Sequence, residues 1–437
     1  MSQPGSSNEQ QQKTAELRTP NGVFALPLIE GTEGDWAVDI SELRARAGLI
    51  TLDDGYSNTG SCQSAITFID GDAGILRYRG IPVEQLAAEG SFLETALLLI
   101  RGELPTQRDL ERFSARVTQH ALLHEGMRHH FEGFPPSAHP MAIISAMISA
   151  LSCYRPELLR KDDEEEDLMD TVAMLMSKVR TIAAFSYKKS IGEPIAYPNP
   201  IRDYSESFLN MMFSRPHVDH EPTPEEVRAL QMFLILHADH EQNCSTSTAR
   251  MVGSSGANMF ASVAAAVLAL WGRLHGGANA SVVSMLEEIQ HGDETPASII
   301  EKTKRKELKL FGFGHRIYRA FDPRVKVFKM ACDALLDSLG RTDPLVDIAR
   351  EVERRALADD YFVERQLYPN VDFYSGILLR ALGIPTNMFT VMFAIGRLPG
   401  WIAHWSEGWR QEGRIHRPRQ VYVGPTQRDY VPIDERA

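Results

Sequence analysis

The pattern of apolar positions changes character along the chain. As far as Tyr78, apolar residues occur in short runs bounded by turn-forming residues, a pattern typical of β-strands. These runs are VFALPLI (23–29), WAVDI (36–40), GLITL (48–52), SAITFI (64–69) and GILRY (74–78). After Pro82, apolar residues recur at helical spacing in longer segments separated by Pro, Gly and Asn. We therefore expect a mainly all-α protein with a small β-rich N-terminal module.

Local signals indicate where several helices begin. The segment TPEE (223–226) combines a cap residue, a proline at the first helical position and a glutamate at the third. It predicts a helix that runs to about His240. Asp343-Pro344 predicts another helix, and residues 106–109 a third of the same kind. The acidic run 162–167 is expected to begin a helix, because carboxylates favour the positive end of the helix dipole.

Composition and charge describe an ordinary globular chain. It has 437 residues, of which 43% are apolar and 24% charged, and 46 basic residues against 58 acidic ones give a net charge of −12. This charge disfavours general attraction to nucleic acid or to an anionic membrane, because both require a positive field. The longest apolar run, residues 260–271, is shorter than the roughly 20 residues that span a bilayer and predicts a buried core helix.

The cysteines and the N-terminus favour a cytoplasmic protein. The four cysteines lie far apart, with no C-x-x-C pair, so neither a disulfide framework nor a zinc knuckle is indicated. The first 20 residues are polar and have neither an apolar secretory stretch nor the arginines of a transit peptide. We expect them to form a frayed leader.

Motif searches leave histidine as the main candidate for chemistry. The chain contains no Walker loop, no G-x-S-x-G elbow and no H-E-x-x-H helix. Gly312-Phe313-Gly314 is the only G-x-G near a helix start, and Ile317 occupies the place of the third glycine of a dinucleotide-binding loop. A Rossmann or P-loop cofactor is therefore disfavoured.

Two histidines, His237 and His240, lie three residues apart in LILHADHEQN and share a helix face. This spacing fits a structural role, an anionic ligand or a metal, although no third metal ligand is evident. His275 lies in LHGGAN and His315 follows GFG, so glycines allow a close approach to both rings. Asp372 lies among aromatic residues in YPNVDFYSG, which would raise the basicity of a carboxylate, although a helix cap is an equal alternative.

Arginines recur near these segments, at Arg324, Arg397 and Arg417. Guanidinium groups bind carboxylates through two hydrogen bonds, so the set suits a small di- or tricarboxylate, although any one of them could form a surface ion pair. The basic run 302–309 could attract a phosphorylated ligand, but a solvated helix face explains it as well.

Taken together, HADHEQN, GSSGAN, LHGGAN, GFGHRIYRAFDPR, PNVDFYSG and RPRQVYVG resemble the citrate synthase family in their order and spacing, from about Gly55 to the C-terminus. The resemblance implies a fold with a large and a small helical domain, the small domain closing on the large one. The boundaries expected from it are 1–55 for the leader and β-rich module, 56–279 with 386–437 for the large domain, and 280–385 for the small domain.

The resemblance also implies the chemistry. Asp372 would remove a methyl proton from acetyl-CoA, His275 would donate to the thioester oxygen, and His315 would protonate the ketone of oxaloacetate. Hydrolysis of the citryl-CoA would follow, with no metal and no cofactor besides acetyl-CoA as a substrate. The residues that match the family's oxaloacetate ligands are His237, His240, Arg324, Arg397 and Arg417, and those matching CoA contacts are Arg319 and Gly314.

A homodimer or a larger homo-oligomer such as a hexamer is expected from the same resemblance, with no nucleic-acid or membrane partner. Inhibition by NADH is not expected, because residues 214–217 lack the cysteine that regulated bacterial forms often carry there. Three alternatives stay open at this point. They are a 2-methylcitrate synthase that uses propionyl-CoA, a non-catalytic binding protein of the same fold, and a histidine metalloenzyme.

Overall fold

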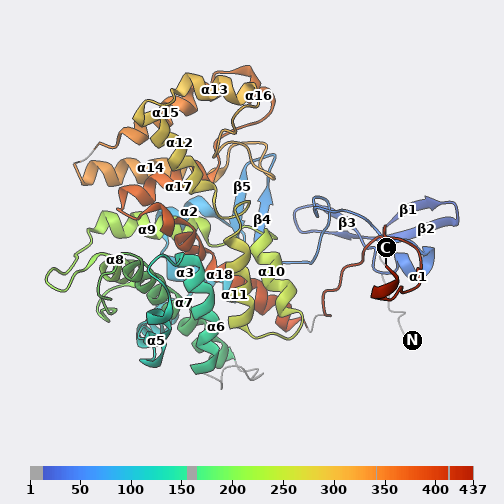
Figure 1. Ribbon diagram of the computed structural model, residues 1–437, viewed down its shortest axis with the longest axis horizontal. Helices are drawn as coiled ribbons and strands as arrows, with labels where there is room; N and C mark the ends of the chain where they lie inside the picture. Colours follow the sequence, from blue (N-terminus) through green and yellow to red (C-terminus); the bar gives the residue numbers. More distant parts are fainter. Residues whose placement is uncertain (1–12, 155–164, 341, 412–413, 437) are drawn as a thin grey trace, which may run out of the picture. The chain divides into compact units, whose positions relative to one another are not determined.

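The computed structural model describes residues 13–154, 165–340, 342–411 and 414–436 (Figure 1). The chain forms two compact units. One unit combines Met1–Gln63 with His416–Ala437, and the other is Ser64–Ile415. The second unit holds the helical part of the chain, and it contains every predicted catalytic residue.

The N-terminal unit is built on a three-stranded antiparallel sheet in the order β1-β2-β3. Its elements are β1 (Thr14–Thr19), β2 (Gly22–Glu30), β3 (Trp36–Val38), α1 (Leu43–Ala47) and the 3-10 helix η3 (Ile433–Glu435). Leu26 on β2 packs with Leu43 and Ala47 of α1 in a small apolar core. The β-rich N-terminal module expected from the sequence is confirmed.

Two local expectations in this unit are wrong. Residues 14–19, expected to belong to a frayed leader, form β1 and pair with β2 from Thr14 opposite Pro27 to Thr19 opposite Gly22. GLITL (48–52) forms no strand, because α1 precedes it and Gly48, with φ at 71°, ends that helix in the left-handed conformation. The apolar run therefore lies in a loop.

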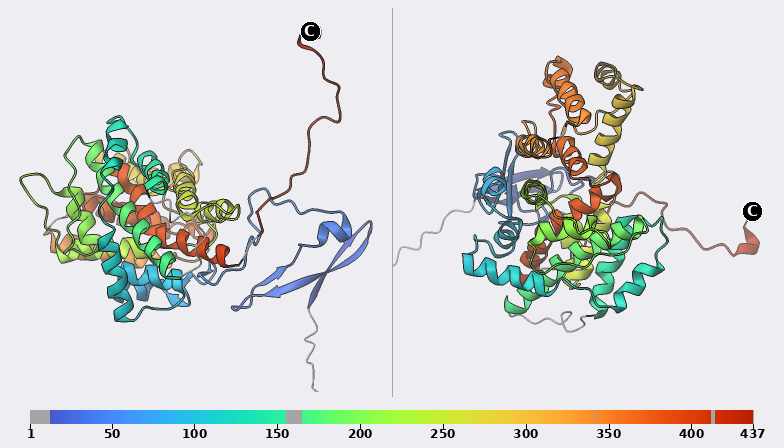
Figure 2. Two further views of the ribbon diagram at one scale, coloured as in Figure 1. Left: turned by 90° about the horizontal axis from the view of Figure 1, so that it is seen from below. Right: turned by 90° about the vertical axis from the view of Figure 1, so that its left-hand side faces the viewer.

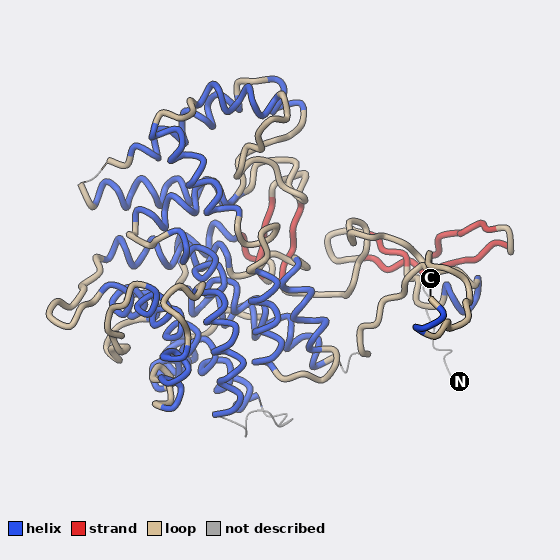
Figure 3. The backbone as a smooth tube through the Cα atoms, viewed as in Figure 1, coloured by secondary structure: helices blue, strands red, loops and turns tan. Residues whose placement is uncertain are grey.

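The larger unit carries a second small sheet, with β4 (Thr67–Asp70), β5 (Ile75–Tyr78) and β6 (Ile81–Pro82) antiparallel in that order. Figure 3 shows these strands in red beside helices that form most of the unit. Its helices are α2 (Val83–Glu89), α3 (Phe92–Arg101), α4 (Gln107–Gln119), α5 (Gly126–Gly133), α6 (Pro140–Tyr154), α7 (Glu165–Ser190), α8 (Tyr204–Phe213), α9 (Pro224–His237), α10 (Cys244–Gly253), α11 (Met259–Leu270), α12 (Ala278–His291), α13 (Pro296–Lys304), α14 (Pro323–Ser338), α15 (Pro344–Leu357), α16 (Asp360–Glu364), α17 (Val371–Ala381), η2 (Thr386–Met388) and α18 (Phe389–Arg410).

Most predicted helix starts are confirmed. α9 begins at Pro224 behind a complete capping box formed by Thr223 and Glu226, and α4 begins directly after its cap residue Thr106. α15 likewise follows Asp343-Pro344. α9 ends at His237, so His240 lies in the turn beyond it. For the acidic run, α7 begins at Glu165, and residues 162–164 lie outside the described residues.

α18 runs through the core of the larger unit. It contacts α3, α9, α10 and α11, and Figures 1 and 2 show it among these helices in red. Nearly every side chain from Phe389 to Ser406 is buried. Helices α12 to α17 contact one another in the region expected to form the small domain, but Ser64–Ile415 clusters as one unit, so the boundaries at 280 and 385 stay a prediction.

In the described part of the chain, no helix combines the length and the apolar character that a membrane span requires.

Candidate active site

Two buried histidines lie close together in the chain, but His237 is the last residue of α9 and His240 lies in the turn beyond it, so the prediction that they share a helix face is wrong. His237 Nδ1 lies 2.9 Å from the carbonyl oxygen of Phe233, and the two rings stack. A carbonyl oxygen only accepts, so Nδ1 carries the proton and Nε2 presents a lone pair. Nε2 is buried and has no hydrogen-bond partner among the described residues. Burial, with Arg324 and Arg397, lowers the pKa of His237 to about 3, which keeps the ring neutral.

Arg397 on α18 lies directly beside this pair. Its Nε donates to the carbonyl oxygen of His237 at 2.6 Å, while its buried Nη1 has no partner within the described ranges. Gly396 makes the contact possible, because a Cβ there would lie 3.0 Å from His237 Cβ. Burial lowers the pKa of Arg397 to about 10, which leaves the guanidinium charged at neutral pH. A buried cation with an unsatisfied N–H group is suited to binding a carboxylate.

His240 faces His315, with ring centroids 5.3 Å apart, and Tyr318 contacts both rings. His315 Nδ1 accepts the backbone N–H groups of Ile317 at 3.0 Å and Tyr318 at 3.2 Å. Burial and the charge of Arg324 lower the pKa of His315 to about 4. His315 is therefore neutral at pH 7, and because Nδ1 is an acceptor its only N–H group is at Nε2.

The loop that carries His315 is joined to the segment that carries Asp372. Asn370 donates its backbone N–H to the carbonyl oxygen of Gly312 and its side-chain amide to that of Gly314, each at 2.8 Å. The same side chain accepts the backbone N–H of Asp372 at 3.0 Å and so caps α17. Asn370 thus holds two segments together that are more than 50 residues apart in sequence.

Two glycines permit this arrangement. Gly312 and Gly314 have φ angles of 77° and 74°, in the left-handed region that favours glycine. A Cβ at Gly312 would lie 2.8 Å from the Phe373 ring, and one at Gly314 would lie 2.9 Å from Leu367. Both positions therefore need glycine for backbone conformation and for space.

A buried ion pair lies next to Asp372. Arg324 donates from Nε and Nη2 to the two carboxylate oxygens of Asp322, at 2.9 and 2.7 Å. Asp322 also accepts the backbone N–H of Val371 at 3.0 Å, which fixes the first turn of α17 to the pair. Burial raises the pKa of Asp372 to about 6, opposed by Arg324 and reinforced by Asp322. A carboxylate with a pKa near the working pH is well suited to act as a general base.

His275 lies in the turn between α11 and α12. Its Nε2 accepts the backbone N–H of Ser245 at 3.3 Å and lies 2.9 Å from Ser245 Oγ. Because a backbone N–H only donates, Nε2 is the acceptor and Nδ1 carries the proton. Burial, with Arg397, lowers the pKa of His275 to about 4. Gly276 is required in this turn, since a Cβ would lie 2.3 Å from the carbonyl oxygen of Leu270.

The structure brings most predicted site residues together, with two exceptions. Arg319 has an exposed side chain 3.7 Å from Asp72, and its backbone N–H donates to the carbonyl oxygen of Gly71. Arg417 belongs to the N-terminal unit and is not among the residues brought together in Ser64–Ile415. In the described ranges, no group of three or more His, Cys, Asp or Glu side chains is arranged to hold a metal ion.

Several residues that shape the site were not predicted from the sequence. Asn370 and Asp322 lie inside the quoted motifs, and their places before Val371-Asp372 and Pro323-Arg324 are recognisable helix-cap patterns. Ser245 contacts His275, and Trp401 contacts Ser245, only through tertiary packing, so no local signal indicates them.

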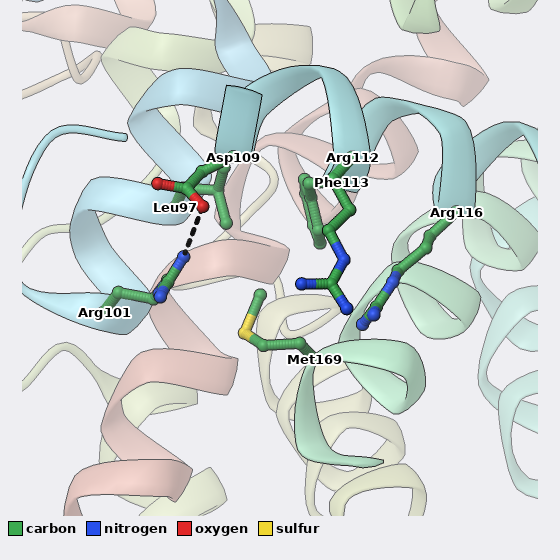
Figure 4. A pocket seen from close by; sticks show the side chains of 7 residues that line it. All are labelled: Leu97, Arg101, Asp109, Arg112, Phe113, Arg116 and Met169. Carbon is green, nitrogen blue, oxygen red and sulfur yellow. Dashed lines mark ion pairs between the residues drawn. The ribbon is translucent and has the colours of Figure 1, made fainter. Parts of the chain in front are cut away.

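Two hollows in the larger unit differ in how close they lie to the predicted site residues. One of about 170 Å³ lies between α3, α4 and α7, and none of the predicted site residues lines it (Figure 4). It is lined by Leu97, Arg101, Asp109, Arg112, Phe113, Arg116 and Met169. A larger one of about 570 Å³ is lined by Gly277, by residues of α12 and by residues 386–390. The larger hollow is thus the one that begins beside the His275 turn.

Known proteins share this sequence and fold. The family of the citrate synthase C-terminal domain matches residues 55–419. Citrate synthase 1 of Mycobacterium tuberculosis is 50% identical over 427 residues, covering 97% of this chain and 99% of that protein. Citrate synthase of Corynebacterium glutamicum is 48% identical over 427 residues, covering 97% of each.

Solved structures of citrate synthases are similar to this chain in fold. Citrate synthase from Pyrobaculum aerophilum has a TM-score of 0.80 at 34% identity, covering 99% of this chain and 100% of that one. A ternary complex of Thermoplasma acidophilum citrate synthase with carboxymethyl coenzyme A and oxaloacetate has a TM-score of 0.80 at 31% identity, covering 88% and 100%.

Proposed function

Because this chain belongs to the citrate synthase family and condenses acetyl-CoA with oxaloacetate and water to give citrate and CoA, we propose that His275, His315 and Asp372 carry out the chemistry. The observation that carries this proposal is the protonation state of the three side chains, which gives two hydrogen-bond donors and one base. Two neutral imidazoles each have one defined N–H group, and one buried carboxylate has its pKa raised to about 6.

Asp372 removes a proton from the methyl group of acetyl-CoA while His275 Nδ1–H donates a hydrogen bond to the thioester oxygen. The electron pair of the broken C–H bond forms the carbon–carbon double bond, and the π pair of the thioester C=O bond moves onto its oxygen, which shares the His275 Nδ1 proton as the enol forms. The α-proton of a thioester is too weakly acidic for a carboxylate acting alone, so the oxygen must be stabilised as its charge develops. A neutral imidazole suits this role, because its Nδ1–H group can donate a hydrogen bond to the oxygen as negative charge develops there.

Condensation then forms the new carbon–carbon bond. The enol carbon attacks the ketone carbon of oxaloacetate, and His315 Nε2–H gives its proton to the ketone oxygen, which becomes the hydroxyl of citryl-CoA. The methyl proton held by Asp372 then returns through water to His315, and a water molecule cleaves the thioester to release citrate and CoA. The depressed pKa of His315 means that the ring enters this step neutral, with Nε2–H as its only N–H group, and this group faces the alkoxide that develops on the ketone oxygen.

Oxaloacetate is held by histidines and arginines around Arg397. Arg397 Nη1 and His237 Nε2 are buried groups that lack partners among the residues described, so a bound dicarboxylate would satisfy the first of them directly. Arg324 is charged and paired with Asp322, which positions it beside the same histidines. The proposed oxaloacetate ligands are His237, His240, Arg324, Arg397 and Arg417.

CoA is contacted by Gly314 and Arg319 in this proposal. The exposed guanidinium of Arg319 suits a phosphate of CoA. Residues 280–385 close on the rest of the helical unit after oxaloacetate binds, which excludes water until condensation is complete. The enzyme needs no metal or further cofactor, and it works as a homodimer or a larger homo-oligomer in the cytoplasm.

One assay tests the assignment against its main alternative. Release of free CoA is measured with oxaloacetate and either acetyl-CoA or propionyl-CoA, with and without a chelator. We expect a preference for acetyl-CoA of at least about tenfold, because one methylene in a tight pocket is worth about 1–3 kcal/mol. Faster turnover of propionyl-CoA would favour a 2-methylcitrate synthase, and loss of activity in chelator would favour a metalloenzyme.

We also propose that Arg417 of one subunit reaches the oxaloacetate held by its partner. Two inactive variants, Arg417→Ala and Asp372→Asn, are co-expressed with different tags and the mixed dimers are isolated. In each mixed dimer one site carries both lesions and the other carries none, so the isolated species should have about half the wild-type activity. Mixed dimers no more active than either parent would place Arg417 in the site of its own subunit or outside it.

A further inference from the structure

Two tryptophans on α18, Trp401 and Trp405, bury their indole rings and donate to different acceptors. Trp401 Nε1–H donates to Ser245 Oγ at 3.1 Å, and Trp405 Nε1–H donates to the backbone carbonyl oxygen of Ala257 at 3.2 Å. Trp401 is fully buried and Trp405 is 8% exposed. Only the first of these contacts leads to a residue of the proposed catalytic set, because Ser245 contacts His275.

Ser245 Oγ is a junction of three hydrogen-bonding contacts. It lies 3.1 Å from Trp401 Nε1, 2.7 Å from Asn243 Oδ1 and 2.9 Å from His275 Nε2. An indole N–H can only donate, so the serine oxygen must accept from Trp401. The Asn243 oxygen already accepts the backbone N–H of Thr246 at 3.1 Å, as the N-cap of α10. The single serine proton can go to the second lone pair of this amide oxygen or to His275 Nε2.

The tautomer of His275 depends on this junction. With the proton on Nδ1, Nε2 accepts the Ser245 backbone N–H, and the Ser245 hydroxyl can donate to this nitrogen or to Asn243 Oδ1. With the proton on Nε2, that ring N–H would face the Ser245 backbone N–H and could only donate to Ser245 Oγ. An N–H group that donates to the serine oxygen polarises the hydroxyl, which strengthens it as a donor and weakens it as an acceptor. Donation from Trp401 thus favours the first arrangement.

We propose that Trp401 is a positioning residue for proton abstraction from acetyl-CoA. Its indole N–H, acting through the Ser245 hydroxyl, keeps the His275 proton on Nδ1, where it stabilises the enol oxygen. This inference rests on the proposed role of His275, and it concerns a residue that touches no reacting atom.

The test compares Trp401→Phe with Trp405→Phe. Both variants lose one buried indole N–H on the same helix, but only the first loses a contact that leads to His275. We expect Trp401→Phe to lower kcat about five- to tenfold, the range that one lost hydrogen bond gives, with the KM for oxaloacetate unchanged. The isotope effect on kcat with methyl-deuterated acetyl-CoA should be at least as large as in the wild type. Trp405→Phe should keep the wild-type kcat.

A direct readout is the tautomer itself. In protein labelled with [15N]histidine, the His275 signals, assigned by their loss in His275→Ala, should show a protonated Nδ1 in the wild type and in Trp405→Phe. Trp401→Phe should show a fraction with the proton on Nε2. An unchanged His275 spectrum, or equal kcat values for the two tryptophan variants, would overturn the inference.

A second variant keeps the inference testable if Trp401→Phe does not fold. Ser245→Ala removes the only acceptor for a proton on Nε2 but keeps the backbone N–H that donates to this nitrogen, so the His275 proton should stay on Nδ1, and adding Trp401→Phe should then not shift it. A fraction with the proton on Nε2 in Ser245→Ala would equally overturn the inference. Failure of the underlying proposal is distinguishable, because in that case His275→Ala itself would retain wild-type turnover.

Discussion

The raised pKa of Asp372 predicts how the rate of citrate formation depends on pH. If Asp372 is the base, as proposed, it must be ionised to accept the methyl proton, so activity is present above its pKa and is lost as pH falls through it. With a pKa of about 6, about 99% of Asp372 is ionised at pH 8 and about 9% at pH 5. The rate should therefore fall about elevenfold between pH 8 and pH 5. At its ordinary pKa of 3.8, the same carboxyl would be about 94% ionised at pH 5 and the rate would barely change.

The two proposed catalytic histidines do not titrate between pH 5 and pH 8. His275 and His315 both have pKa values lowered to about 4, so their rings stay neutral above pH 5. The carboxylates of oxaloacetate also stay ionised there, since ordinary carboxyl groups titrate near pH 4. The fall between pH 8 and pH 5 is therefore attributable to Asp372.

The assay follows the loss of thioester absorbance in the ultraviolet, which avoids thiol reagents that fail in acid. Rates at low concentrations of both substrates report the ionisations of the ligand-free enzyme. The residual activity of Asp372→Asn serves as the control, because it should show no fall over this range. A midpoint below pH 5 in the wild type, or the same fall in Asp372→Asn, would refute the reasoning.

Three further results are expected. Asp372→Asn should lower turnover at least about 100-fold, while calorimetry shows that oxaloacetate still binds; lost binding with intact turnover would make Asp372 a substrate ligand. Gly312→Ala should lower turnover about 100-fold by displacing the His315 loop, whereas Gly408→Ala, whose Cβ would meet nothing within 4 Å, should be silent; equal activity of the two would contradict the packing argument. Thermal stability should fall as pH drops below about 6.5, because buried histidines with depressed pKa values bind fewer protons in the folded state than in the unfolded one. Asp372, whose pKa is raised, opposes this effect by one proton. A melting temperature that increases as pH is lowered from 6.5 to 5 would contradict this prediction.

Elements with strong local signals were predictable from the sequence, and those that depend on partners were not. α9 begins where Thr223 and Glu226 predicted, because a capping box acts within four residues. β1, in contrast, has the mixed sequence TAELRT and becomes a strand through its pairing with β2. GLITL has the composition of a strand, but no neighbouring strand pairs with it in the described residues.

The same distinction holds within the site. His275, His315 and Asp372 were predicted because glycines and aromatic residues next to them in sequence modify their surroundings. The raised basicity of Asp372 was also predicted, from its aromatic neighbours. The tautomer of His275 was not, because Ser245, whose backbone N–H sets it, comes close only through folding. A sequence motif thus identified which side chains could react, whereas folding determined which of their atoms carries the proton.

The bridge made by Asn370 has a consequence for redesign of the enzyme. It joins the segment that carries the proposed ketone acid to the segment that carries the proposed base, so the spacing between the two groups is fixed by these hydrogen bonds. His275 comes from a different turn and is not part of these joined segments. Variants selected for a bulkier acyl thioester should therefore carry substitutions in the residues between these joined segments and the His275 turn. Substitutions within 312–315 or 368–372 should be absent from such variants.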